Sequence, residues 1–187
     1  MPQTLERAAG TLKATIKGSE NRIGKLYQEG SSRLFFPENF SKTKECVVIN
    51  TAGGITGGDK FESSIEATEG SSIVVTTQAS EKVYKSSHGS AEVETTFFAS
   101  KNSKLLWLPQ DTILFSESDL SRKIIIRIED TSELLAFDQI VLGRSAMGEN
   151  IQESNFHDMW KIYNGDRLIY FDQSGWENTA PLNCAGL

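Results

Sequence analysis

The sequence predicts a mainly β fold, built from stacked antiparallel or mixed β-sheets in a β-sandwich or helicoidal arrangement, with few short helices. Three observations lead to this fold class. The dominant hydrophobic period is two residues, which is the period of a half-buried strand. Gly, Ser, Asn or Asp bounds each alternating segment, as expected for strands joined by turns. A helical period of 3.6 residues is scarce along the whole chain.

Each predicted strand has a pattern of its own. Residues 61–70 alternate, so that Phe61, Ile65 and Ala67 share one face with Ser63. No internal repeat is apparent in the sequence. The segments with a strand pattern, in chain order, are residues 45–50, 61–70, 72–78, 91–100, 123–130 and 166–172.

Residues 131–144 fit either a short helix or a strand. The apolar spacing at Leu134, Leu135 and Ile140 suits a helix, whereas residues 137–142 alternate as a strand does. Because the flanking segments are predicted strands, a strand is favoured here as well.

The composition indicates a single domain over residues 1–187. Hydrophobic residues make up 38% of the chain and charged residues 24%, as in globular proteins. The net charge of −6 argues against binding to nucleic acid or to an anionic membrane surface. No apolar run is long enough to span a membrane and no signal-peptide core is visible, so a cytoplasmic location is expected. Cys46, in a predicted strand, is expected to be a buried thiol.

The glycine-rich stretch NTAGGITGGD, residues 50–59, raises the question of a phosphate site. Its outer glycines have the spacing of a P-loop, but Asp59 stands where a P-loop has lysine, and a carboxylate there would repel phosphate. A strand pattern follows the stretch, whereas a dinucleotide-binding turn leads into a helix. The glycines are therefore expected to permit a sharp turn or a close crossing of two backbone segments, with Asp59 held beside it. An ordinary turn with an exposed aspartate is the alternative. The glycines concerned are Gly53, Gly54, Gly57 and Gly58.

No motif in the sequence calls for catalytic chemistry. Only two histidines are present, and neither has the spacing of a zinc site. No G-x-S-x-G elbow marks a nucleophilic serine. Scattered carboxylates do not indicate acid–base catalysis by their presence alone. The sequence therefore predicts a protein that is not an enzyme.

Three further stretches are more irregular or more polar than plain strands. They are TTQASEKVYKS at residues 76–86, WLPQDTILF at residues 107–115 and LGRSAMGE at residues 142–149. A polar network that satisfies backbone groups around irregular strands is the simplest interpretation. The residues of interest in them are Gln78, Glu81, Lys82, Tyr84, Trp107, Arg144 and Glu149.

Together with the glycine-rich stretch, these segments resemble the UreD family of urease accessory proteins. The four blocks occur in the family's order, and RLFFPE before them and FHDMWKIYNGDRLIYFD after them also fit. The resemblance runs from about Arg33 to near the C-terminus. It implies a non-enzymatic protein that helps to load nickel into apo-urease, with stacked β-sheets and a water-filled internal passage for the metal. It also implies binding to apo-urease and to the accessory protein UreF, which recruits the GTPase UreG.

The chain differs from the family in its length. Members are usually longer, so the single domain is expected to lack the family's C-terminal part. Missing strands would leave a sheet edge and apolar surface open, so we expect low solubility or dependence on a partner.

On this resemblance, nickel is expected to pass through the protein transiently, and no stably bound cofactor is expected. Isolated carboxylate and carbonyl oxygens can release such an ion, whereas a closed Cys/His cage would trap it. Lys82, Tyr84 and Arg144 are expected to organise the loops, with an Arg144–Glu149 ion pair as one possibility. Two other functions stay open: a non-catalytic β-sandwich module that binds a protein or a carbohydrate, and a nucleotide-dependent enzyme built on the glycine run. The candidate nickel contacts are Asp59, Asp138, Glu149 and Asp172.

Overall fold

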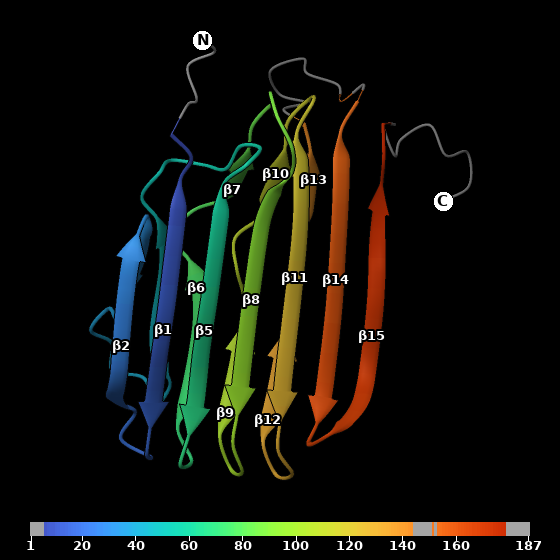
Figure 1. Ribbon diagram of the computed structural model, residues 1–187. Coiled ribbons are helices and arrows are strands. Elements are labelled where there is room, and N and C mark those ends of the chain that lie inside the picture. The colour runs from blue at the N-terminus through green and yellow to red at the C-terminus, as the bar shows by residue number, and fades with distance from the viewer. Residues whose placement is uncertain (1–5, 144–150, 152, 179–187) are drawn as a thin grey trace.

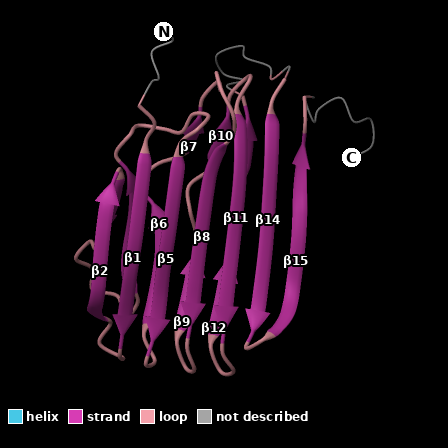
Figure 2. Ribbon diagram, in the orientation of Figure 1, coloured by secondary structure: helices cyan, strands magenta, loops and turns pink. Residues whose placement is uncertain are grey.

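Fifteen β-strands and the turns between them make up the described part of the chain. The computed structural model describes residues 6–143, 151 and 153–178, and all of its regular elements are strands (Figure 1). Figure 2 shows the same molecule coloured by secondary structure, with strands and loops alone. The predicted mainly β class with stacked sheets is confirmed. The described residues form no helix, so they contain no helix that is long and apolar enough to cross a membrane.

One large sheet of seven strands forms the front layer in Figure 1, and we call it the front sheet. Its strands lie side by side in the order β15–β14–β11–β8–β5–β1–β2. They are β1 (Ala9–Lys17), β2 (Arg22–Gly30), β5 (Lys60–Thr68), β8 (Ala91–Ala99), β11 (Asp119–Ile128), β14 (Asn155–Asn164) and β15 (Arg167–Trp176).

Two shorter sheets form the back layer. The lower back sheet has five strands in the order β12–β9–β6–β4–β3, and the upper back sheet has three in the order β13–β10–β7. In Figure 1, β9 and β12 lie behind the lower half of the front sheet, and β10 and β13 behind its upper half. The strands are β3 (Ser32–Phe35), β4 (Lys44–Asn50), β6 (Ser72–Thr77), β7 (Glu81–Val83), β9 (Lys104–Trp107), β10 (Thr112–Leu114), β12 (Glu133–Ala136) and β13 (Ile140–Leu142).

The chain winds through these layers as a solenoid. Each turn runs along one front strand and returns through one lower and one upper back strand. Nine of the twelve strand pairs in the described residues are therefore parallel. Ser72 pairs with Lys104, and Lys104 pairs with Glu133, so successive turns are offset by 32 and 29 residues. This repeat is absent from the sequence because the turns share strand positions and not residue identities.

Inward-facing side chains form two separate hydrophobic cores. In the larger core, Ile65, Phe97 and Ile126 pair across three front strands, and each is fully buried. Burying a side chain of this size contributes about 1.5–3 kcal/mol. The smaller core lies toward the upper back sheet and includes Val83 and Leu114. The face predicted for residues 61–70 is the one that the structure buries, and the thiol of Cys46 is buried as expected.

Strand β15 forms one edge of the front sheet and is exposed along most of its length. Four consecutive apolar residues on it, Leu168, Ile169, Tyr170 and Phe171, are 46–51% exposed. This is an unpaired, apolar sheet edge of the kind that invites pairing with another chain. The expected dependence on a partner stays a prediction.

Four stretches of chain cross the gap between the two back sheets, one in each turn. These crossing segments are residues 51–54, 78–80, 108–111 and 137–139. The stacked positions that flank them are 9, 8, 7 and 6 residues apart in successive turns, so the separation of these positions along the chain falls by one residue per turn. The flanking positions are Cys46, Val75, Trp107 and Ala136 on the lower side, and Ile55, Val83, Leu114 and Leu142 on the upper side.

Candidate functional site

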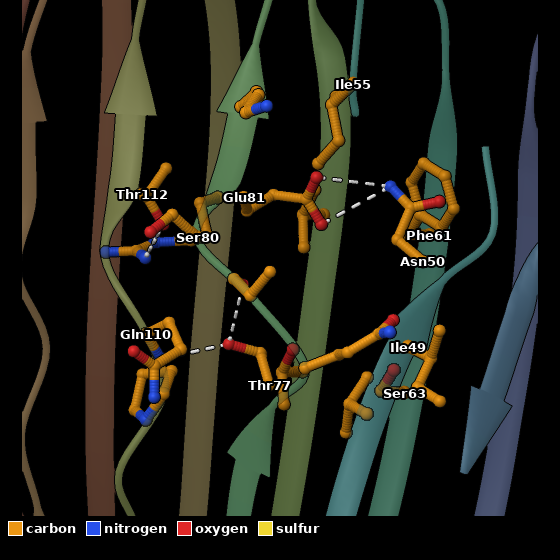
Figure 3. A pocket seen from close by; sticks show the side chains of 18 of the residues that line it. Ile49, Asn50, Ile55, Phe61, Ser63, Thr77, Ser80, Glu81, Gln110 and Thr112 are labelled. Carbon is orange, nitrogen blue, oxygen red and sulfur yellow. Dashed lines mark hydrogen bonds between the residues drawn. The ribbon is translucent and has the colours of Figure 1, made fainter. Parts of the chain in front are cut away.

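The crossing segments line a cavity of about 350 Å³ inside the solenoid, which we call the inner cavity (Figure 3). It lies between the two cores, since its wall includes Trp107 of the larger core and Phe61 of the smaller one. Unlike the two cores, its mainly apolar wall also carries many polar side chains. The polar side chains that line it include Asn50, Ser63, Thr77, Gln78, Ser80, Glu81, Thr95, Gln110, Thr112, Arg122 and Asp138.

Glu81, at the start of β7, places a carboxylate in this wall. The Asn50 side-chain amide lies 3.3 Å from each of the two carboxylate oxygens and donates to them, as Figure 3 shows. The same amide group also donates to the Gly54 carbonyl at 3.1 Å. Burial raises the pKa of Glu81 above its ordinary value of 4.5, and the Asn50 hydrogen bond opposes that shift. This neutral partner leaves the carboxylate charge available to a cation.

Replacing Glu81 by glutamine is expected to raise the free energy of unfolding at pH 7, because a neutral amide avoids the cost of burying a charge. Since the pKa of Glu81 is raised on folding, the folded state binds more protons than the unfolded state. Wild-type stability therefore falls as the pH rises from 4.5 through the folded-state pKa.

The advantage of Glu81→Gln should be small at about pH 4 and should grow toward pH 7. Urea denaturation across this range measures it, with the exposed Glu92→Gln as a control for the loss of one negative charge. A difference that does not change with pH would contradict the expectation.

Trp107 presents a free donor to the inner cavity. The residue is 7% exposed, and its ring packs against Phe97 with centroids 4.9 Å apart. Its indole Nε1 has no acceptor among the described residues, although a buried N–H without a partner costs about 1–3 kcal/mol. Because Trp107 lines the inner cavity, this N–H can donate to a molecule inside it.

A buried arginine held by two aspartates also lies in the wall. Arg122 on β11 donates through Nε and Nη2 to the two carboxylate oxygens of Asp158 on β14, at 2.9 and 2.6 Å. Its Nη1 lies 2.6 Å from Oδ2 of Asp138, in the crossing segment 137–139. All three side chains are at most 9% exposed. We call these three residues the Arg122 cluster.

The charges of the Arg122 cluster are coupled by its burial. Burial lowers the pKa of Arg122, but the hydrogen bonds to Asp158 and the negative charges of Asp138 and Asp158 outweigh this and raise it, so the guanidinium stays charged. Burial raises the pKa of Asp138, and the charge of Arg122 opposes the shift. One cation thus faces two carboxylates, and the cluster has a net negative charge when both are ionised.

A second cavity, of about 610 Å³, lies beside the first and is called the outer groove. The front sheet continues through β14 and β15 past β12, the last strand of the lower back sheet, and the outer groove lies in this overhang. Apolar side chains from residues 134–137 and from β14 line the outer groove, together with Asp172 of β15. Arg122 and Asp138 line both cavities, so the two spaces meet at the Arg122 cluster.

The residues predicted from the sequence are distributed over both cavities. Asp172 lines the outer groove, and Asp138 lies at the junction. Arg144 and Glu149, with their possible ion pair, lie outside the described residues. In the part of the chain that the structure describes, no three His, Cys, Asp or Glu residues form a group able to hold a metal ion. The other predicted residues that line the inner cavity are Gly53, Gly54, Gln78, Glu81, Lys82 and Trp107.

Asp59 has a structural task. It is 3% exposed, and its two carboxylate oxygens accept hydrogen bonds from the backbone N–H groups of Ala8 and Thr56, at 2.9 and 2.8 Å. The carboxylate thus closes the glycine-rich turn and ties the start of the chain's first strand to it. Both oxygens are committed to backbone donors, so we place Asp59 in the support of the site and not in the path of an ion.

The glycines of this turn allow close packing against residues 82–89. A Cβ at Gly57 would overlap the hydroxyl of Ser86 and the carbonyl of Gly89, and a Cβ at Gly54 would overlap the ring of Tyr84. Tyr84 also packs edge-on against Phe115, with ring centroids 5.2 Å apart. The structure therefore shows a close crossing of two backbone segments at these glycines.

Three residues of the site were not singled out from the sequence: Asn50, Arg122 and Asp158. Arg122 does carry a signal, because it shares the inward face of its strand with Leu120 and Ile124, where an apolar residue is expected. A charge on that face needs a buried partner of opposite sign. The partner Asp158 lies 36 residues away, on the next turn.

Comparison with known proteins gives consistent matches. A family model described as UreD urease accessory protein matches residues 6–187. The urease accessory protein UreD of Rhizobium leguminosarum bv. viciae is 44% identical over 172 residues, which are 92% of this chain and 63% of that protein. UreD of Rhizobium rhizogenes is 44% identical over 89% of this chain and 61% of its own length. UreD 1 of Brucella ovis is 39% identical over 91% and 61%. The chain thus spans less than two thirds of these relatives.

Proposed function

The chain belongs to the family of UreD urease accessory proteins, and on that premise we propose that it serves the nickel-dependent maturation of urease. Within this role we propose a non-catalytic scaffold whose inner cavity conducts nickel toward apo-urease. The observation that carries the proposal is the inner cavity with its polar side chains, which lies between two apolar cores and meets the outer groove at Arg122 and Asp138.

The wall chemistry supports passage rather than storage. Glu81 lies in the inner cavity, Asp138 at the junction and Asp172 in the outer groove, so carboxylates recur along the way. Oxygen ligands presented one at a time bind a divalent cation more weakly than a closed set of His and Cys ligands does. An ion can therefore exchange from one carboxylate to the next, and no stably bound cofactor is needed.

We further propose the partners and the location that follow from this role. The protein would bind apo-urease and a UreF-type accessory protein, and through the latter a UreG-type GTPase, in the cytoplasm. The relatives are named urease accessory proteins, which supports a helper role and not a catalytic one. The present chain spans 63% of the length of the Rhizobium leguminosarum relative.

Blocking the inner cavity is expected to abolish nickel delivery. Thr95, on β8, lines the cavity with a small side chain, and Thr95→Phe would fill part of its volume. The variant is introduced into a host that carries urease genes but lacks its own copy of this protein, and nickel-dependent urea hydrolysis is measured. Activity should fall to background, about tenfold or more below the unmodified chain, because a bulky ring leaves no continuous path.

The matched control is Thr96→Phe on the same strand. Thr96 follows Thr95 directly, so its side chain points to the opposite face of the front sheet. This variant should retain activity. Melting temperature and co-purification with urease should be unchanged in both variants, which separates a blocked path from lost folding or lost binding. Full activity of Thr95→Phe would refute the conduit.

A further inference from the structure

We propose that the guanidinium of Arg122 closes the junction between the inner cavity and the outer groove by neutralising part of the charge of Asp138 and Asp158. When the Arg122 side chain moves away from these two carboxylates, they form a binding site for a divalent cation. This inference rests on the proposed conduit function and adds a gate to it. The guanidinium of Arg122 thus occupies the position between the two carboxylates that a divalent cation would take.

The position of Arg122 is the first support. Among the residues lining the two cavities, only Arg122 and Asp138 are common to both. Any ion that moves from one space to the other must therefore pass these two side chains. A fixed positive charge at this point repels a cation, so the junction is closed to metal while the guanidinium is in place.

The geometry of the two carboxylates is the second support. Both Asp138 and Asp158 approach the same planar guanidinium, at 2.6 Å in each case. The hydroxyl of Thr112 lies 3.5 Å from Nη1. Carboxylate and hydroxyl oxygens gathered around one cation are the ligand type that hard divalent cations take.

One oxygen of this set is left without a hydrogen bond. Oδ2 of Asp138 is buried and has no hydrogen-bond donor in the described residues, although Nη1 of Arg122 lies 2.6 Å away. The contact is therefore one of charge without a directed N–H bond, unlike the two bonds that Arg122 makes to Asp158. Since a buried carboxylate with free acceptor capacity is costly, Oδ2 is the atom most ready to accept another cation.

The charges favour exchange of the guanidinium for a divalent ion. Two carboxylates carry a charge of −2, which Arg122 neutralises only by half. A divalent ion would neutralise it fully.

Removing the guanidinium without removing its bulk tests the proposal. Untagged wild-type protein, Arg122→Met and the double variant Arg122→Met/Asp158→Asn are titrated with Ni²⁺ by calorimetry, and their melting temperatures are recorded with and without the metal. Arg122→Met should bind one Ni²⁺ at least tenfold more tightly than the wild type. Its melting temperature should rise by about 5–10 °C at a Ni²⁺ concentration of about 100 times Kd.

The controls separate this site from other metal contacts. The exposed histidines His88 and His157 are present in all three proteins, so their contribution cancels. The double variant should lose the added affinity, because one carboxylate of the pair is gone. Equal Ni²⁺ affinity of Arg122→Met and the wild type would overturn the proposal.

A second variant decides the question if Arg122→Met does not fold. Arg122→Lys keeps a positive charge but cannot hold two carboxylates in a forked geometry, so a divalent cation should compete with it. It should bind Ni²⁺ more tightly than the wild type, and no gain in affinity would overturn the proposal. The test uses no urease. Metal binding by these variants, with full urea hydrolysis by Thr95→Phe, would thus refute the conduit and leave the cation site standing.

Discussion

Replacement of Asp59 by alanine is expected to lower the free energy of unfolding by about 2–5 kcal/mol. The side chain is 3% exposed, and its two oxygens accept the backbone N–H groups of Ala8 and Thr56. Alanine leaves both donors without their acceptor at a partly buried place. Two partly buried N–H groups that lose a charged partner together account for this magnitude. Urea denaturation followed by fluorescence measures the loss.

Asp59→Asn is the matched variant. It keeps the size of the side chain and one acceptor oxygen, so about half of the loss is expected. If Asp59→Ala instead kept wild-type stability but lost urease activation, the carboxylate would contact the metal, as the sequence alone first suggested. The stability measurement therefore separates a supporting role from a ligand role at this position.

Replacement of Gly57 by alanine is expected to cost about 3 kcal/mol or more, because the added methyl group has no room. Its Cβ would overlap the hydroxyl of Ser86 and, more seriously, the backbone carbonyl of Gly89. A hydroxyl can rotate away, but the carbonyl moves only if residues 86–89 move. The melting temperature should fall by several degrees, at about 2–4 °C for each kcal/mol in a chain of this size.

Gly53→Ala is the matched control in the same turn. A Cβ at Gly53 would meet no atom within 4 Å, but the backbone there has φ +82°, which disfavours any residue with a side chain. The expected loss is about 1–2 kcal/mol, from backbone strain alone. Equal losses for Gly53→Ala and Gly57→Ala would contradict the view that close packing is what requires glycine at position 57.

Sequence alternation predicted several of the strands, although not β1, β2, β3 or β14, because burial acts on each strand locally. Residues 61–70 show this: Phe61, Ile65 and Ala67 lie inward, as their spacing predicts. In the ambiguous residues 131–144, the strand interpretation was right for residues 133–136 and 140–142, which form two separate strands, while residues 137–139 cross between the back sheets. Alternation with a period of two residues identifies which side chains of a strand point inward. This identification does not depend on which strand lies next to it.

The winding of the chain could not be predicted in the same way. Parallel pairing joins residues about one turn apart, such as Val75 with Trp107 and Trp107 with Ala136. These stacked residues differ in size and shape, so no repeat of identities marks the turn. The few helices expected are not found in the described residues, because short back-layer strands and tight turns connect one front strand to the next.

The candidate site was predicted in part. Glu81 was selected as a polar residue in an irregular stretch and Asp138 as a candidate nickel contact, and both line the inner cavity. Arg122 was passed over because it sits within a plain strand, and its role depends on Asp158 in a later turn. A charged residue at an inward-facing position can be recognised in the sequence. The oppositely charged partner that offsets the cost of burying it is identified only by the three-dimensional structure.

The decreasing separation of the stacked positions has an evolutionary consequence. The strands on both sides of the gap stay in register while the stacked positions that flank it go from 9 to 6 residues apart along the chain. A single-residue insertion or deletion here alters the inner cavity without shifting either core. An insertion or deletion inside a strand shifts its register and turns its side chains to the wrong face. In this solenoid, the wall of the inner cavity can instead change by single residues between the back sheets while the register of the strands is preserved.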